Sequence, residues 1–89
     1  MNIEYTVQIW QEGNQFVAHA MPMDVMSAGV TPEEARKALD EAVHLFVETA
    51  AEMGNIEEIL QESGYEIHEG KWASPFCVAI ERHTTAVGV

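Results

Sequence analysis

The side chains best suited to metal binding or nucleophilic catalysis are four histidines and a single cysteine: His19, His44, His68, His83 and Cys77. No two histidines have the His-x-His or His-x-x-x-His spacing that brings two imidazoles to one metal ion, and no histidine stands close to Cys77 in the sequence. Cys77 lies in an apolar run, where a thiol is expected to be buried as a small hydrophobic side chain. We therefore expect no metal site, no cofactor and no cysteine nucleophile.

Carboxylates are the other residues that could do chemistry, because several of them converging from different elements can bind Mg²⁺. Glu4, Asp24 and a carboxylate of a predicted helix would form such a set in a minimal Mg²⁺-dependent nuclease. Support for this trio is weak, because Glu4 alternates out of step with its apolar neighbours and Asp24 falls in a loop. Phosphate-binding glycine patterns are absent from the sequence. We expect a binding protein, and keep the nuclease as an alternative.

The net charge of the chain is strongly negative. Four Lys and Arg residues stand against fifteen Asp and Glu residues in 89 residues, which gives −11. A chain this acidic repels nucleic-acid backbones and anionic lipid, so we expect it to bind neither nucleic acid by itself nor a membrane. The charge favours a basic partner, or it serves only to keep a small protein in solution.

The cellular compartment is suggested by what the sequence lacks. One cysteine cannot form an internal disulfide, and the start from Met1 to Glu4 has neither the basic nor the apolar region of a secretion signal. No apolar run approaches the roughly 18 residues of a membrane span. These features predict a cytoplasmic protein.

The first part of the chain predicts three strands. Apolar and polar residues alternate from Ile3 to Ile9, which is the pattern of a strand with one buried face. A turn over residues 11–14 precedes a second alternating run at Phe16, Ala18 and Ala20. Pro22 ends that strand, and residues 25–28 predict a short third one.

A long helix is predicted from Thr31 to Gly54. Thr31 can cap it, Pro32 suits its first position, and Glu34 completes a capping box. Apolar residues then recur at three- and four-residue steps up to Met53, and the opposite face is polar: Glu33, Lys37, Asp40, Glu41, His44, Glu48 and Glu52. We expect ion pairs of Glu33 with Lys37 and of Arg36 with Asp40, which stand four residues apart.

The rest of the chain predicts a short helix, an irregular return and one more strand. Asn55 can cap a helix that ends at Gly64, and residues 65–72 show no regular pattern. Residues 76–80 are all apolar, which indicates a strand covered on both faces or placed at a subunit interface. Residues 84–89 carry no charge and form a tail or an arm.

Together these elements predict one small α+β domain over residues 1–83, a three-stranded meander with the long and the short helix on one face and a fourth strand. The other face of the sheet would be bare. A second copy of the chain is the expected cover, with Trp10, Phe16 and the 76–80 run available for the contact. We expect a homodimer or a tetramer with Phe76, Val78 and Ile80 in its interface.

About half of the chain, residues 3–50, resembles the HicB family of antitoxins. The resemblance rests on Tyr5-Thr6-Val7-Gln8-Ile9, on Phe16-Val17-Ala18, and above all on Ser27-Ala28-Gly29-Val30-Thr31-Pro32-Glu33-Glu34-Ala35. The family usually has Pro-x-Leu-Pro-Gly-Cys in the loop where this chain has the shorter Pro22-Met23-Asp24-Val25-Met26. The resemblance implies a partial RNase H-like domain with the fourth strand beside the first, and it implies no DNA binding here, because the chain ends without the family's DNA-binding segment.

The resemblance also implies a function. HicB-like proteins neutralise HicA-type toxins, which are small basic RNA-cleaving proteins, by masking the RNA-binding surface. An acidic module suits this task because it competes with RNA for a basic site. The candidate contact residues lie on the polar face of the long helix: Asp40, Glu41, His44, Glu48 and Glu52. A stand-alone dimeric module that binds another protein or a small ligand remains an alternative.

Overall fold

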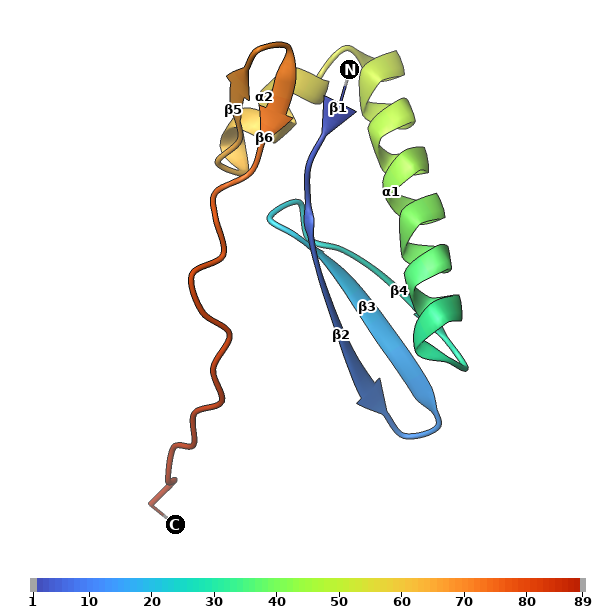
Figure 1. Ribbon diagram of the computed structural model, residues 1–89, viewed down its shortest axis with the longest axis vertical. Helices are drawn as coiled ribbons and strands as arrows, with labels where there is room; N and C mark the ends of the chain where they lie inside the picture. Colours follow the sequence, from blue (N-terminus) through green and yellow to red (C-terminus); the bar gives the residue numbers. More distant parts are fainter. Residues whose placement is uncertain (1, 89) are drawn as a thin grey trace.

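Two small sheets and two helices form the α+β fold of residues 2–88, the part of the chain that the computed structural model describes (Figure 1). The first sheet is antiparallel, in the order β2 (Thr6–Glu12), β3 (Gln15–Met21), β4 (Val25–Gly29). The second is mixed, in the order β1 (Asn2–Ile3), β6 (Lys71–Ala73), β5 (Glu66–His68). The helices are α1 (Pro32–Met53) and α2 (Ile56–Glu62).

The predicted meander is confirmed, with one difference. The first predicted strand is divided into β1 and β2, which belong to different sheets, and Glu4 and Tyr5 form the break between them. Ala18 of β3 pairs with Ile9 of β2 on one side and with Ser27 of β4 on the other. Because directly paired residues point to the same face, these positions define the face of the sheet that meets α1.

The signals that start and end α1 are also confirmed. The Thr31 side-chain oxygen accepts a hydrogen bond from the Glu34 backbone N–H at 3.1 Å. The Glu34 carboxylate accepts one from the Val30 N–H, one residue before the Thr31 N–H that a capping box uses. Gly54 ends the helix in the left-handed region at φ 77°, where its N–H donates to the last carbonyls of α1. This conformation favours glycine over every residue with a side chain.

The core lies where α1 packs on β3 and β4. Ala18, Ala20, Ala35 and Leu39 have no exposed surface, and the small alanines let the helix lie close to the sheet. The closest approach is at Gly29. A Cβ atom added there would lie 2.6 Å from the Ala35 backbone nitrogen and 2.8 Å from the Glu34 carbonyl carbon. Only a glycine fits at this position.

A second part of the core joins α2 to the small mixed sheet. Ile56 and Leu60 of α2 are buried together with Tyr65 and Trp72, and the Tyr65 hydroxyl donates a hydrogen bond to the Glu4 carbonyl. The Glu4 N–H in turn donates to the Trp72 carbonyl. These contacts join Tyr65 and β6 to Glu4, which directly follows β1.

The C-terminal predictions are partly wrong. Residues 65–72 are not irregular, because β5 and β6 form a hairpin there with Glu69 and Gly70 in its turn, both at positive φ. Residues 76–80 form no strand, and the strand beside the start of the chain is β6 instead. The physical reason is Trp72, whose buried indole anchors β6, whereas the side chains of residues 76–80 find no covering surface in a single chain.

Three individual side chains also differ from expectation. Cys77 is exposed, because the segment that carries it is not covered. Asn55 precedes α2 but makes no side-chain capping hydrogen bond. Phe16 packs on the helix side of the sheet and is not available to a partner on the open face, where Trp10 lies.

Replacement of Gly29 by alanine tests the close contact between β4 and α1. We expect Gly29→Ala to lower the free energy of unfolding by roughly 1–3 kcal/mol, because backbone atoms of α1 cannot move aside as a flexible side chain would. Gly88→Ala is the matched control, since a Cβ atom there meets nothing. Thermal or urea unfolding followed by circular dichroism measures both, and equal stability of the two variants would contradict the close packing.

Candidate functional site

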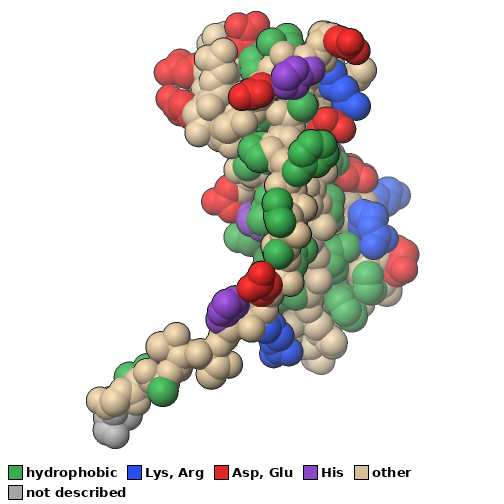
Figure 2. Space-filling view, turned by 60° about the vertical axis from the view of Figure 1, so that its left-hand side comes forward, with side chains coloured by type: hydrophobic (Ala, Val, Ile, Leu, Met, Phe, Trp, Pro, Cys, Tyr) green, Lys and Arg blue, Asp and Glu red, His purple; other side chains and the backbone are tan. Residues whose placement is uncertain are grey.

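The most distinctive surface of the protein is a set of exposed carboxylates on the two helices, which we call the acidic layer: Glu33, Glu34, Asp40, Glu41, Glu48, Glu52, Glu57, Glu58 and Glu62. They are nine of the fifteen acidic residues. Lys and Arg are absent from residues 38–70. Figure 2 shows acidic side chains gathered at the end of the molecule that contains α2 and β5.

Arg36 and Lys37 are the only Lys or Arg residues on the two helices, and neither forms an ion pair with the acidic layer within residues 2–88. The predicted ion pairs of Glu33 with Lys37 and of Arg36 with Asp40 do not form within residues 2–88. In that range the one ion pair made by a Lys or Arg joins Lys71 to Glu4, with 3.3 Å between Nζ and Oε2. Carboxylates therefore outnumber Lys and Arg on the two helices, and the resulting negative field can attract a basic ligand.

The structure places the five predicted contact residues on one exposed face of α1. Asp40, His44, Glu48 and Glu52 follow one another at four-residue steps, and Glu41 lies beside this row. His44 Nε2 lies 3.4 Å from Glu48 Oε1. Asp40 forms the edge of the face nearest the sheets, where its Oδ1 accepts a hydrogen bond of 2.6 Å from the Tyr5 hydroxyl.

An apolar groove borders this face on its other side, between α1 and α2. It has a volume of about 390 Å³, and its main lining residues are Leu45, Phe46, Thr49, Met53, Asn55 and Ile59. Leu45 is 64 % exposed and Met53 is 72 % exposed, although Met53 was expected on the buried stripe. Helical periodicity alone did not reveal the groove, because it depends on the angle at which α2 turns back beside α1.

Both tyrosines of the chain form hydrogen bonds at the break between β1 and β2: Tyr5 lies in the break, and Tyr65, which precedes β5, donates to the Glu4 carbonyl. Burial is the main cause that raises the pKa of Tyr5 to about 12, and the hydrogen bond to Asp40 and its charge add to the effect. Burial likewise raises the pKa of Tyr65 to about 12, with a contribution from the charge of Glu4. Both phenols are therefore neutral donors at physiological pH, and they hold the junction of the two sheets together.

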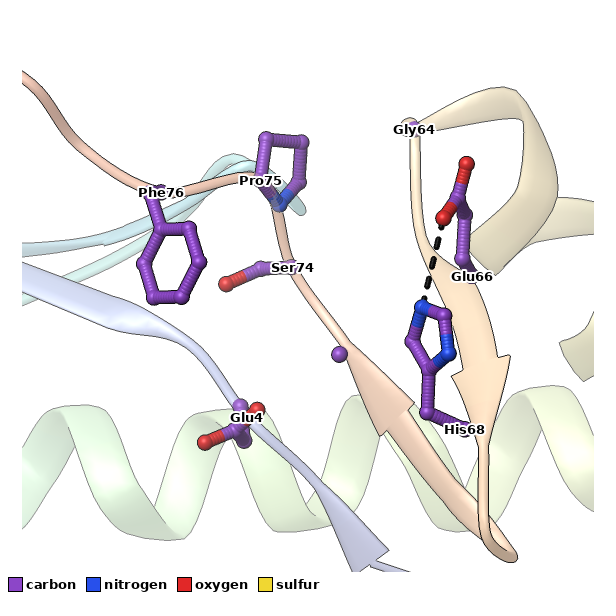
Figure 3. Close-up of a pocket in the computed structure, with 8 residues that line it drawn as sticks. Glu4, Gly64, Glu66, His68, Ser74, Pro75 and Phe76 are labelled. Carbon is purple, nitrogen blue, oxygen red and sulfur yellow. Dashed lines mark hydrogen bonds and ion pairs between the residues drawn. The ribbon is translucent and has the colours of Figure 1, made fainter.

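A cavity of about 360 Å³ lies near this junction, beside β5 and the segment that follows β6 (Figure 3). Glu4, Glu66, His68 and Ser74 supply its polar groups. His68 Nε2 contacts Glu66 Oε2 at 3.3 Å, while the Ser74 side chain points away from His68. The arrangement does not assemble a nucleophile with its base, so the geometry supports no hydrolytic step here.

The carboxylates of the nuclease alternative are held apart by other partners. Glu4 pairs with Lys71, Asp24 Oδ1 lies 2.6 Å from His19 Nε2, and Asp40 binds Tyr5. Across residues 2–88 no group of three or more His, Cys, Asp or Glu side chains is placed to hold a metal ion. The trio proposed for Mg²⁺ is therefore not brought together.

Comparisons with protein-family models, with curated proteins and with solved structures found no match to this chain. The likeness to HicB antitoxins thus rests on the sequence motifs quoted above. Within the described residues, neither helix combines the length and the apolar character needed to cross a membrane.

An alkaline titration tests the two tyrosine contacts. A phenol in the unfolded chain ionises near pH 10, whereas both phenols keep their protons to about pH 12 in the folded chain. The unfolded state loses protons first, so the contribution of the two phenols to stability should be constant below about pH 10 and fall as the pH rises toward 12.

Phenolate absorbance and far-UV circular dichroism, recorded together, should show phenolate forming only as helical signal is lost. Tyr5→Phe is the control that leaves Tyr65 as the single phenol. Two phenols that titrate near pH 10 while the helices stay intact would contradict the buried contacts.

Proposed function

We propose that this protein is an antitoxin-like binding protein that neutralises a HicA-type toxin by covering its basic RNA-binding surface with the acidic layer. The observation that carries the proposal is the large excess of carboxylates over Lys and Arg on α1 and α2. Nine exposed carboxylates lie on these helices, and none of them is paired with a Lys or Arg within residues 2–88.

Electrostatics favours this function over a merely solubilising charge. A net negative charge anywhere on the surface favours solubility, whereas here residues 38–70 carry only one sign and form a single-signed field, which is the arrangement that steers a partner. A single-signed surface steers an oppositely charged partner toward it and competes directly with the phosphates of RNA. The motif from Ser27 to Ala35, which resembles the HicB family, supports the same partner class.

Inhibition of RNA cleavage tests the proposal. We expect this protein to inhibit cleavage by a purified HicA-type toxin and to relieve the growth arrest that the toxin causes when the two are co-expressed. The double variant Glu48→Lys with Glu52→Lys should raise the concentration needed for inhibition by about tenfold, and added salt should weaken inhibition by the unchanged protein.

The matched control changes the net charge equally at a distance from the helices. Glu12→Lys with Glu81→Lys alters the end of β2 and the C-terminal segment, both exposed. The control should inhibit like the unchanged protein. Undiminished cleavage at a molar excess of the unchanged protein, or equal loss of inhibition in the two double variants, would contradict the role of the acidic layer.

A second candidate function is that of a dimeric module, and the exposed C-terminal segment favours it. Phe76 is 97 % exposed and Val78 is 95 % exposed. With Ile80 they stand at alternate positions of the segment that runs out from the body of the molecule after β6 (Figure 1). Alternate side chains of an extended segment share one side, so this segment has the form of a strand without a sheet. We infer that it pairs with a second copy, because β2 is an edge strand with free backbone groups.

Charge is compatible with this contact. The segment from Ser74 to Gly88 contains one Glu and one Arg, so two copies can meet there without bringing their acidic layers together. Light scattering after gel filtration should show a dimer or tetramer for the unchanged chain and a monomer for the triple variant Phe76→Ser, Val78→Ser, Ile80→Ser. A monomeric unchanged chain would exclude the pairing.

A further inference from the structure

The apolar groove between α1 and α2 lies among the carboxylates of the acidic layer. Its exposed members, Leu45 and Met53, have no cover within the described residues, and Phe46 and Ile59 form its half-buried floor. A mixed surface of this kind, apolar in the centre and charged at the rim, is typical of a protein-binding site.

We propose that this groove binds the apolar face of a basic amphipathic α-helix supplied by the partner protein. The proposal rests on the proposed function and specifies which part of the partner contacts the acidic layer. Leu45 and Met53 are the apolar contacts, and the carboxylates beside them hold the Lys or Arg residues of the bound helix.

The walls of the groove favour a helix over an extended peptide. The lining comes mostly from α1, with Ile59 from α2 and Asn55 between them, and helical backbone N–H and C=O groups are used internally, so they offer no ladder to an added strand. A helical ligand brings its own backbone hydrogen bonds and needs only to bury side chains. The lining also contains an unsatisfied polar atom, since Asn55 Oδ1 is buried and accepts no hydrogen bond from the described residues.

The rim of the groove selects a basic ligand. Glu41 and Glu48 stand four residues before and three residues after Leu45, which places them next to it on the surface of α1. On α2, Glu62 stands three residues after Ile59. With no Lys or Arg in residues 38–70, an acidic helix would be repelled along the whole length of the groove.

The same charges argue against a second copy of this chain as the occupant. Two copies joined through the groove by a twofold axis would bring two acidic rims face to face, which is destabilising. The chain's own C-terminal segment leaves the molecule on the side away from α1 (Figure 1). A different, basic partner therefore fits best.

Binding of designed peptides tests this assignment. The probe is a fluorescently labelled peptide of leucine and lysine whose leucines recur every three or four positions, and the comparison peptide has the same composition in an order that forms no apolar face. Measured by fluorescence anisotropy, the patterned probe should bind at least about tenfold more tightly than the reordered one. Equal affinity would overturn the proposal, because charge alone would then explain binding.

Variants locate the site. Leu45→Ser with Met53→Ser should weaken binding of the patterned probe about tenfold, since both side chains are exposed and can change without loss of the fold, which circular dichroism verifies. Met26→Ser with Val87→Ser removes equally exposed apolar side chains elsewhere and should have no effect. Unchanged affinity of the groove variant would overturn the proposal.

This result is separable from the antitoxin proposal. If the groove variant keeps its affinity while the unchanged protein still inhibits RNA cleavage, the groove assignment fails and the antitoxin function stands. If the patterned probe binds in the groove but RNA cleavage is not inhibited, the groove assignment stands and the antitoxin function fails.

Discussion

The close packing of α1 on the β2-β3-β4 sheet decides which residues of this protein face solvent. Alanines in β3 and at the start of α1, together with Gly29, bring the helix backbone against the sheet, and Leu39 fills the space that remains. Once this side of α1 is fixed, the polar side must point outward, with its carboxylates side by side. The tyrosine hydrogen bonds at the break between β1 and β2 then connect the helix to the second sheet.

Charge and shape coincide on the surface that this packing exposes. The row from Asp40 to Glu52 lies along the outer face of α1, and the apolar groove lies next to it because α2 turns back after Gly54. The acidic layer alone would attract many cations without discrimination. A groove within it adds a requirement for shape, which is how a binding protein distinguishes one basic partner from other polycations.

The sequence was a good guide where local chemistry decides structure, and a poor one where packing does. Alternation predicted the meander, and Thr31, Pro32 and Gly54 predicted both ends of α1. The hairpin of β5 and β6 was missed because its strands are short and their pairing depends on the burial of Trp72. The ion pair of Arg36 with Asp40 was predicted from spacing, yet Tyr5, which is distant in the sequence, binds Asp40 instead. The groove could not be predicted from the sequence either, because its lining residues from α1 and α2 come together only in the folded chain.

We expect the acidic layer of α1 and α2, and not the sheet, to contact the basic partner. Nuclear magnetic resonance tests it most directly, by titrating an unlabelled HicA-type toxin into the isotope-labelled chain and following each backbone amide. We predict that the perturbed amides lie in α1 and α2, around Leu45, Glu48, Glu52 and Ile59. Perturbations confined to the open face of the β2-β3-β4 sheet or to the segment after Ala73 would contradict the account.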